Sequence, residues 1–385
     1  METNTLKNRF KEIYGTDSTV YFAPGRVNII GEHTDYNGGL VLPCAISFGT
    51  YLAVSNNTDN KFRFETTNFD YKVAVEIPDL QNKHGDEWVN YPLGVIDQFS
   101  KKSVKFSHGL NLLFSGDIPN GAGLSSSASI ELVTAVALNE IFHAGLERLD
   151  LVKMSQMAEN QFVGMQCGIM DQFAVGMGKA NSALFLNCRT LEYELVPLDL
   201  KDHAIVIMNT NKRRELADSK YNERVAECAK ALEFLKKAKP GMVDLSDITL
   251  EEFERLGSSI SDSVIFSRAR HVISENNRVL QAVSALKKGD LFTLGQLMND
   301  SHESLRHDYQ VTGIELDTIV NAARKVKGVL GARMTGAGFG GCAIAIVDKR
   351  YVEAVINKVG PAYEKEIGLK PYFYVANVGD GAGKV

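Results

Sequence analysis

The chain has 385 residues, of which 44% are hydrophobic and 23% are charged, and its formal net charge is −5. This length predicts two domains, each large enough to bury a core of its own. The composition excludes a wholly disordered chain, and the negative charge balance argues against a large basic surface for nucleic acid.

The first half of the sequence predicts several strands followed by a few helices. β-rich or alternating runs that end near Asn, Asp or Pro predict strands at 51–55, 62–65, 73–77 and 109–114. A long apolar stretch over 125–143 predicts a buried helix. A second helix is expected over 151–163, with Asp150 as its N-cap.

The second half is mostly helical after two buried strands, expected at 183–186 and 205–208. One helical face is formed by Val225, Cys228, Leu232 and Leu235. Four further helices are expected near 264–286, 291–305, 314–327 and 351–365, with an apolar strand at 343–347.

Strands and helices therefore segregate along the chain instead of alternating strictly. This arrangement predicts an α+β fold rather than a doubly wound sheet. We place the boundary between the two expected domains near 190–200, which gives residues 1–195 and residues 196–385.

The five cysteines are scattered and include no C-x-x-C pair, so the sequence indicates neither a disulfide framework nor a zinc site. The first residues lack the pattern of a secretory signal, and no run of 18 apolar residues occurs. We therefore expect a cytoplasmic protein with no membrane partner.

The sharpest motif is a glycine-serine run, residues 119–129, that opens the helix expected from 125. Its glycines let the backbone approach a ligand, and the helix start offers unpaired N–H groups to an anion. Three consecutive hydroxyls follow, and such a group can also bind Mg²⁺ beside a phosphate. Phosphate binding and simple capping of the helix both remain open. A Walker A loop does not occur.

A second glycine-rich run, residues 336–341, matches G-x-G-x-x-G but precedes a strand instead of opening a helix. That context excludes a dinucleotide fingerprint, and no H-R-D or D-F-G element of a protein kinase accompanies it. Two interpretations remain: the run is a turn that leads into a strand, or its backbone is held close to another group.

Two further segments carry polar groups next to apolar ones. In residues 25–39, a strand-like run stops at Gly31, and Glu, His, Thr, Asp and Tyr follow at once, which suits either sugar hydroxyls or a polar turn. In residues 167–173, Asp171 lies in an apolar stretch bounded by glycine. A buried carboxylate must be paired or functional, and the alternative is that Asp171 is the N-cap of a short helix.

Together these motifs resemble the galactokinase family of the GHMP small-molecule kinases. The family's sugar signature is matched throughout by residues 25–39, and its phosphate motif P-x-x-x-G-L-S-S-S-A-S by residues 119–129. The third motif is met by residues 331–342, except that Ala337 replaces a glycine. Smaller matches lie at 167–173, 219–221 and 301–306.

The resemblance spans nearly the whole chain and implies a two-domain GHMP kinase fold with the active site between the domains. It implies that Asp171 is the catalytic carboxylate facing the anomeric hydroxyl of the sugar, with Arg26 as its partner. The positions that match sugar-binding residues are Glu32, His33, Thr34, Asp35, Gly168 and Tyr221.

The resemblance also implies ATP and Mg²⁺ as cofactors. The phosphate loop would comprise Gly121, Ala122, Gly123, Leu124, Ser125, Ser126 and Ser127. Trp88 and Tyr91 match the adenine pocket, and Ser127 and Glu159 match the metal ligands. By pattern alone, Glu159 could instead be a solvent-facing residue of an amphipathic helix.

The implied function is ATP-dependent phosphorylation of galactose at C1, by a monomer whose partners are galactose and ATP and do not include nucleic acid. A related sugar 1-kinase, for example one for N-acetylgalactosamine, is the alternative among enzymes. Some relatives are galactose-sensing regulators without catalysis, and these lack part of the Ser-Ser-Ala segment. Ser126, Ser127 and Ala128 are all present here, which favours an enzyme.

Overall fold

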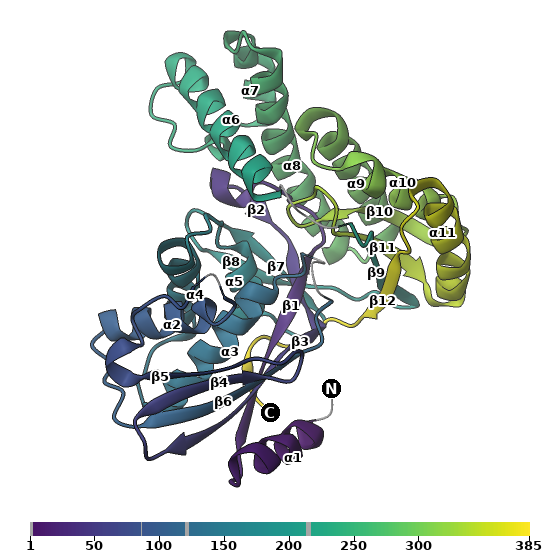
Figure 1. Cartoon of the computed structure of the whole chain (residues 1–385). Helices are drawn as coiled ribbons and strands as arrows, with labels where there is room; N and C mark the ends of the chain where they lie inside the picture. Colours follow the sequence, from purple (N-terminus) through teal and green to yellow (C-terminus); the bar gives the residue numbers. More distant parts are fainter. Residues whose placement is uncertain (1–2, 86, 120–122, 213–216) are drawn as a thin grey trace.

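Two large β-sheets, each with its own set of helices, organise the chain into two lobes (Figure 1). The computed structural model describes residues 3–85, 87–119, 123–212 and 217–385. The α+β prediction is confirmed, because the strands gather in sheets and the helices pack against them.

The sheet of the first lobe has six strands in the order β13-β1-β3-β6-β4-β5. The β4–β6 pair is parallel, and the other neighbours in this sheet are antiparallel. The bounds are β1 Thr19–Asn28, β3 Pro43–Asn57, β4 Lys61–Thr66, β5 Lys72–Glu76, β6 Gly109–Gly116 and β13 Gly383–Lys384.

Helices cover both faces of this sheet. On one face, an apolar core joins the sheet to α2 Asn90–Lys101, α3 Ser126–Ile141, α4 Arg148–Met157 and α5 Met170–Met177. On the other face, α1 Thr3–Tyr14 inserts Leu6 and Phe10 against Val20, Ala53 and Leu113. A small sheet lies where the lobes meet and contains β2 Leu40–Val41, β7 Ser182–Asn187 and β8 Tyr193–Pro197.

The sheet of the second lobe has four antiparallel strands in the order β10-β11-β9-β12. Its central strand β11 is buried along its whole length, since Ala343 and Ala345 face one core while Ile344 and Ile346 face another. The bounds are β9 His203–Asn209, β10 Val329–Thr335, β11 Cys342–Asp348 and β12 Tyr372–Ala376.

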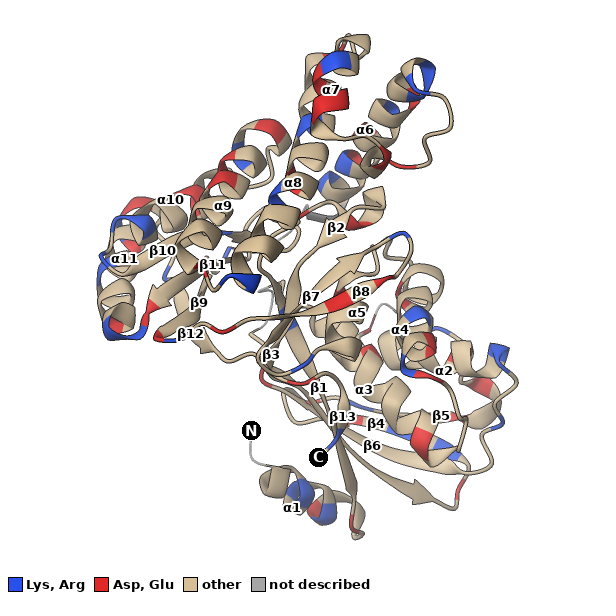
Figure 2. Cartoon of the chain, turned by 180° about the vertical axis from the view of Figure 1, so that it is seen from behind, with Lys and Arg blue, Asp and Glu red and all other residues tan. Residues whose placement is uncertain are grey.

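The second lobe also carries most of the long helices, and α6 and α7 project away from the first lobe (Figure 1). Figure 2 shows charges of both signs spread over these helices, not gathered into one basic face. The bounds are α6 Ala217–Ala238, α7 Leu250–Leu256, α8 Ser263–Lys287, α9 Leu291–Ser304, α10 Gly313–Arg324 and α11 Val352–Ile367.

Short helical segments complete the described chain. Two of them, η3 Ala158–Val163 and η6 Leu305–Tyr309, are π-helical. The others are 3₁₀ turns: η1 Asp35–Asn37, η2 Ile77–Asp79, η4 Leu245–Asp247, η5 Gly257–Ser259 and η7 Lys349–Tyr351. Among the described helices, none is long and apolar enough to cross a membrane.

A third apolar cluster joins the lobes. It packs Val27 and Ile29, at the end of β1, against Ile207 and Ile344 of the second sheet and Leu294 of α9. The polypeptide also returns to the first lobe at its end, because β13 pairs with β1, and the C-terminus therefore lies beside that lobe (Figure 1). The division expected between residues 195 and 196 falls inside β8 and stays a prediction.

The strands and long helices expected from the sequence are confirmed, most with bounds shifted by a few residues, and the strand expected at 51–55 is part of the much longer β3. The expected N-cap Asp150 is wrong: α4 begins at Arg148 with Glu147 as its N-cap, so Asp150 lies in the first turn. The helix expected over 151–163 changes to π-helical geometry at Ala158. The elements that were not predicted from the sequence are α1, α2, α7, β2, β8, β10, β12 and β13.

Candidate active site

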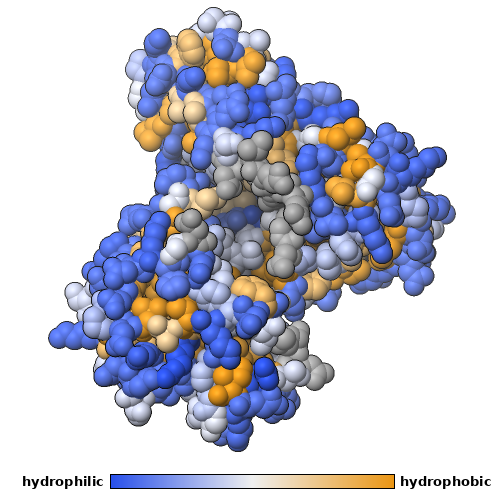
Figure 3. Space-filling view, viewed as in Figure 1, coloured by the Kyte–Doolittle hydropathy of each residue, from blue (hydrophilic) through white to orange (hydrophobic). Residues whose placement is uncertain are grey.

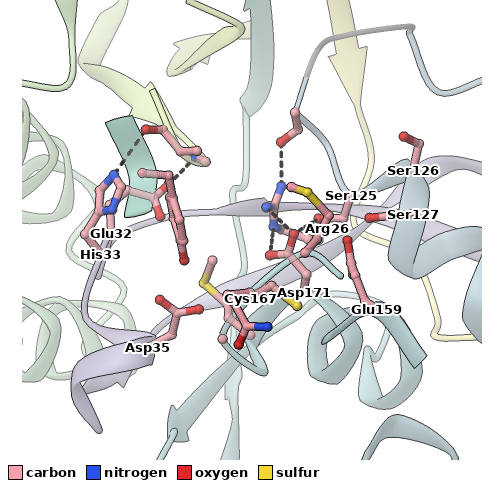
Figure 4. Close-up of a pocket in the computed structure, with 18 of the residues that line it drawn as sticks. Arg26, Glu32, His33, Asp35, Ser125, Ser126, Ser127, Glu159, Cys167 and Asp171 are labelled. Carbon is pink, nitrogen blue, oxygen red and sulfur yellow. Dashed lines mark hydrogen bonds and ion pairs between the residues drawn. The ribbon is translucent and has the colours of Figure 1, made fainter. Parts of the chain in front are cut away.

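A cavity of about 290 Å³ lies between the lobes, and Figure 3 shows the surface hollowed there. In the close-up of Figure 4, Arg26 and Asp171 lie between two groups of residues. One group, Glu32, His33 and Asp35, is called the sugar end below. The other, Ser125, Ser126, Ser127 and Glu159, is called the phosphate end.

Arg26 and Asp171 form a two-pronged ion pair at the centre of the cavity. The distances are 2.8 Å from Nε to Oδ1 and 2.7 Å from Nη2 to Oδ2. Only 5% of the Arg26 side chain is exposed, against 28% of Asp171, so the carboxylate is the partner that faces the cavity. The expected pairing is confirmed. The planar guanidinium of Arg26 binds both carboxylate oxygens and so fixes the carboxylate in one orientation.

Strand β1 presents Arg26 just after an irregularity in its pairing with β3. The preceding residue must be small, because a Cβ on Gly25 would lie 2.7 Å from the carbonyl oxygen of Leu124. The Arg26 backbone N–H donates to that same carbonyl at 3.1 Å, and its Nη1 donates to Gly123 O at 2.7 Å. The glycine-serine segment is therefore fastened to β1 and to the ion pair.

The start of α3 forms the phosphate end. Ser125 adopts a left-handed conformation, φ +63°, and its hydroxyl donates to Asp171 Oδ2 at 2.6 Å. Ser126 is exposed and Ser127 is half-buried, and both line the cavity. Leu124 points into the apolar core between the lobes. The predicted phosphate-loop residues Gly121 and Ala122 lie outside the described residues.

Glu159 lies in the π-helical segment η3 and is buried beside the cavity, so the alternative of a solvent-facing residue is wrong. Burial and the nearby Asp171 charge raise its pKa to about 7, although hydrogen bonds from Ser127, Cys167 and Gln172 oppose this. The two residues expected to bind metal, Ser127 and Glu159, are thus in contact. π-Helical turns are frequent at functional sites.

A second buried carboxyl lies behind Glu159. The Gln172 side-chain amide donates to Glu159 Oε2 at 2.6 Å and to Glu131 Oε2 at 3.1 Å. Burial raises the pKa of Glu131 well above its usual range, and the charge of Glu159 adds to the effect. Two carboxyls sharing one amide therefore favour a protonated Glu131.

At the sugar end, the Glu32 carboxylate is held from two sides. Its Oε1 accepts from the Gly336 backbone N–H at 2.6 Å, and its Oε2 accepts from Asn28 Nδ2 at 2.7 Å. Arg333 Nη1 lies 3.5 Å from Oε1. The second glycine-rich run is therefore a backbone held close to another group, namely the sugar motif.

Asp35 lies against Gly168, where a Cβ would overlap the Asp35 carboxylate. Burial raises the pKa of Asp35 to about 7, and the charge of Asp171 contributes. The neutral form of Asp35 is thus accessible near physiological pH. Gly168 lines the cavity and leaves room for this carboxylate.

His33 places its ring among tyrosines, 5.8 Å from the Tyr221 ring and 4.8 Å from the Tyr309 ring. Its Nε2 lies 3.2 Å from the carbonyl oxygen of Ala337, the residue that departs from the third motif. Burial lowers the pKa of His33 to about 3, so the ring is neutral at physiological pH. Tyr221, expected to bind sugar, lines the cavity as well.

Among the described residues, four of the predicted site residues do not line the cavity: Thr34, Trp88, Tyr91 and Leu124, the last of which lies in the apolar core between the lobes. The buried Thr34 hydroxyl holds the turn of the sugar motif, 2.9 Å from Gly31 O and 2.7 Å from Leu40 O. Trp88 packs its ring against Phe114 in the first lobe, with ring centroids 5.2 Å apart.

The structure also adds residues that the sequence analysis did not single out. Met165, Gln166 and Asn222 line the cavity. On α8, Glu275 Oε1 accepts from the Gly31 N–H at 3.0 Å, and His271 Nε2 lies 3.0 Å from Glu32 O. Glu275 and His271 belong to no recognised sequence motif. The feature that could have revealed them in the sequence is a charged residue and a histidine on the apolar face of a predicted helix.

The cavity lining is acidic. It contains the carboxyl groups of Glu32, Asp35, Glu159 and Asp171, and among its described residues only Arg26 is a Lys or Arg. A nucleotide phosphate would add further negative charge to this lining, so its binding calls for a cation. The described residues contain no ready-made cluster of three or more metal-binding side chains.

Comparisons with known proteins identify the family of the chain. Three family models match the chain: "Galactokinase galactose-binding signature" at residues 8–56, "GHMP kinases N terminal domain" at 90–179 and "GHMP kinases C terminal" at 282–365. The chain is 51% identical to a galactokinase of Clostridium acetobutylicum over 99% of both chains. It is 53% identical to one of Exiguobacterium sibiricum, over 100% of this chain and 99% of the relative.

Solved structures give the same result. A Lactococcus lactis galactokinase complexed with galactose superposes with a TM-score of 0.96 at 44% identity, over 99% of both chains. The mevalonate kinase of Methanococcus jannaschii superposes with a TM-score of 0.67 at 18% identity, over 95% of this chain and 99% of that one. The similarity to the mevalonate kinase shows a shared fold and nothing more.

Proposed function

This chain belongs to the galactokinase family, and we propose that it transfers the γ-phosphoryl group of ATP to the C1 hydroxyl of α-D-galactose. It is a kinase of the GHMP fold, and ATP as the phosphoryl donor follows from that family. The observation that carries the proposed chemistry is the Arg26–Asp171 pair, which lies between a group of sugar-type ligands and a helix start.

Galactose is proposed to bind at the sugar end. Carboxylates accept hydrogen bonds from sugar hydroxyls, and Glu32 and Asp35 both border the cavity. Gly168 and Tyr221 complete the proposed subsite, and Thr34 supports it through the turn that it holds. With its C1 hydroxyl directed at Asp171, the sugar would face the helix start of α3.

ATP is proposed to bind at the phosphate end. The start of α3 offers backbone N–H groups and the positive end of the helix dipole, and Ser125, Ser126 and Ser127 add hydroxyl donors. Gly121, Ala122, Gly123 and Leu124 would complete the loop. We assign the adenine to Trp88 and Tyr91 at the start of α2, outside the cavity between the lobes.

The residues present fit a bound Mg²⁺. Among the described lining residues, four carboxyl groups face a single Arg, and that Arg is paired with Asp171. Ser127 and Glu159 bring a hydroxyl and a carboxylate into contact. Mg²⁺ prefers one or two protein oxygens together with substrate phosphates and water, so a complete protein cage is not needed. We propose these two residues as ligands; the bound ion would neutralise charge on the β- and γ-phosphates.

In the proposed reaction, Asp171 accepts a hydrogen bond from the C1 hydroxyl of galactose. As the C1 oxygen bonds to the γ-phosphorus, the proton passes to Asp171, and the bond from phosphorus to the β,γ-bridging oxygen breaks to release ADP. Arg26 holds the carboxylate in place and brings positive charge to the transferred group. Positioning and charge stabilisation are the main requirements of phosphoryl transfer.

We further propose two GHMP domains, residues 1–195 and 196–385, and a monomeric cytoplasmic enzyme. The location is supported by the five cysteines, all carried as free thiols. The product, galactose 1-phosphate, would be the first intermediate in galactose breakdown.

Incubation of the purified chain with MgATP and a panel of hexoses tests the function. We expect ADP release with galactose, and ³¹P NMR should identify galactose 1-phosphate as the product. Preference for N-acetylgalactosamine would instead indicate the related sugar kinase. Galactose binding without ADP release would indicate a regulator.

A further inference from the structure

A chain of hydrogen bonds runs from the sugar end into the second lobe. His33 Nδ1 lies 2.8 Å from the Tyr36 hydroxyl, which lies 2.7 Å from the Tyr309 hydroxyl. The Tyr309 hydroxyl in turn lies 3.1 Å from the Cys228 sulfur. This series of hydrogen bonds joins η1 to η6 and α6. Neither Tyr309 nor Cys228 lines the cavity.

The direction of these bonds follows from the far side of the ring. His33 Nε2 faces the carbonyl oxygen of Ala337, and a carbonyl can only accept, so Nε2 carries the proton. The ring is neutral because burial lowers its pKa to about 3, so Nδ1 must be an acceptor. The hydroxyl of Tyr36 therefore donates to Nδ1.

The directions of the other two hydrogen bonds are then determined. The Tyr36 oxygen accepts from the Tyr309 hydroxyl, and the Tyr309 oxygen accepts from the Cys228 thiol. Burial raises the pKa of Tyr36 and of Tyr309 well above the usual range and that of Cys228 to about 11, so each member keeps its proton. Asn37 also hydrogen-bonds to the Cys228 sulfur, which leaves the thiol hydrogen for Tyr309.

We propose that Tyr309 and Cys228 are positioning residues that, through Tyr36, lock His33 in the Nε2–H form with both ring nitrogens occupied. His33 then forms a wall of the cavity, and the hydrogen bonds to sugar hydroxyls at this end come from Glu32 and Asp35. The inference rests on the proposed function, because it takes galactose as the ligand of this end.

Ring packing supports a positioning role. The Tyr309 ring lies 4.8 Å from the His33 ring and 4.5 Å from the His271 ring, so His33 rests on a second-lobe side chain. Tyr36 packs edge-on against Tyr221, which lines the cavity, at 5.2 Å. His33 itself has a left-handed backbone, φ +62°, an unfavourable conformation that the surrounding contacts must maintain.

Histidine side-chain ¹H–¹⁵N NMR tests the locked ring directly. The His33 signals are assigned by their loss in His33→Asn. We expect a protonated Nε2 and an unprotonated, hydrogen-bonded Nδ1, with little change when galactose is added to saturation. A protonated Nδ1, or a change of protonation on galactose binding, would overturn the proposal. Calorimetry on the same sample shows whether galactose binds at all, so failure of the proposed function is seen separately.

Tyr309→Phe tests the positioning role. We expect the KM for galactose to rise about five- to tenfold, the size of one buried neutral hydrogen bond, with kcat and the KM for ATP within about twofold. The Nδ1 signal should shift as well. The matched control is Tyr363→Phe, because Tyr363 is equally buried in the second lobe and its hydroxyl donates to Thr210 O at 2.9 Å.

Tyr363→Phe should lower the melting temperature without changing the KM for galactose or the His33 signals. If both variants raise this KM equally, Tyr309 is merely structural and the proposal fails. Cys228→Ala is the milder variant should Tyr309→Phe not fold. For Cys228→Ala, a smaller rise in the galactose KM and a smaller shift of the Nδ1 signal than in Tyr309→Phe would support the proposed series of hydrogen bonds. An unchanged Nδ1 signal would contradict it.

Discussion

The two ends of the cavity are built on different principles. At the sugar end, the polar groups are held by protein partners from both lobes, so the site is fixed before a ligand arrives. At the phosphate end, the serine hydroxyls lie at the start of α3, and Glu159 of η3 lies beside them with the buried carboxyl of Glu131 behind it. The first end is suited to discriminate between substrates, and the second end depends on the ions and phosphates that it binds.

Helix α8 shows how the sugar end is fixed. Glu275 and His271, one turn apart, hold the N–H of Gly31 and the C=O of Glu32. Burial opposes ionisation of Glu275, yet the Arg278 and Arg333 guanidiniums outweigh it and lower the pKa of Glu275 to about 2. This carboxylate therefore stays charged and keeps its contacts over the whole physiological range.

The sugar end should give the largest effect, in the choice between galactose and glucose. The two sugars differ only at the C4 hydroxyl. We propose that the Asp35 carboxylate accepts from this hydroxyl in galactose, so that glucose would leave the carboxylate unpaired. We expect kcat/KM for galactose to exceed that for glucose by at least about 10³. Comparable values, measured by ADP release, would show that Asp35 does not discriminate at C4.

Asp171, which lies between the two ends, should give the second largest effect. Asp171→Asn removes the proton acceptor, and we expect kcat to fall about 10²-fold or more. Calorimetry should show galactose binding preserved, because the sugar end is held by other residues. Asp380→Asn, in an exposed pair with Lys179, is the control and should leave kcat unchanged. Near-normal turnover of Asp171→Asn would remove it from the chemistry.

The phosphate end should respond to metal instead of sugar. With Glu159→Gln, we expect the Mg²⁺ concentration for half-maximal rate to rise about tenfold and kcat to fall, since one carboxylate ligand is lost. The galactose dissociation constant should not change. Glu140→Gln, in an exposed pair on α3, is the matched control. An unaltered Mg²⁺ dependence in Glu159→Gln would exclude this ligand.

Sequence reasoning was most accurate where local pattern determines structure. The buried strand at 343–347 and the helix from 125 follow from apolar periodicity, and the Arg26–Asp171 pair from motif matches. Strands β10 and β12 lack a clear alternating pattern and depend on β11 and β9 as neighbours. Strand β13 has two residues and exists only through its pairing with β1.

Long-range contacts were the part of the site that the sequence could not supply. Gly336 meets Glu32 across 304 positions of sequence, and Glu275 meets Gly31 across 244. Neither contact leaves a periodic signal, because each depends on how the lobes pack. Thr34 has the residue type of a sugar ligand, yet its hydroxyl is spent on the turn of its own loop.

Crowding at the sugar end can be increased by one methyl group. Gly168→Ala would push a Cβ into the Asp35 carboxylate, so we expect the KM for galactose to rise about tenfold, as for a misplaced buried hydrogen bond. The KM for ATP should stay within about twofold. Gly116→Ala is the control, because its Cβ would make only ordinary contacts at 3.9 Å. Equal effects of both variants on the galactose KM would argue against close contact between Gly168 and Asp35.

The smallest expected effect is the pH dependence of galactose binding. Burial and Asp171 raise the pKa of Asp35 to about 7, so this carboxyl becomes protonated as the pH falls from 8 to 6 and loses its power to accept from a sugar hydroxyl. At saturating MgATP, we expect the KM for galactose to rise about five- to tenfold over that range. Because galactose would favour the ionised form, binding at pH 6 should also release a proton, measurable by calorimetry in buffers of different ionisation enthalpy. Asp35→Asn should bind weakly with no proton release and a flat profile. A wild-type KM that is flat between pH 6 and 8 would mean that Asp35 is already ionised without the sugar.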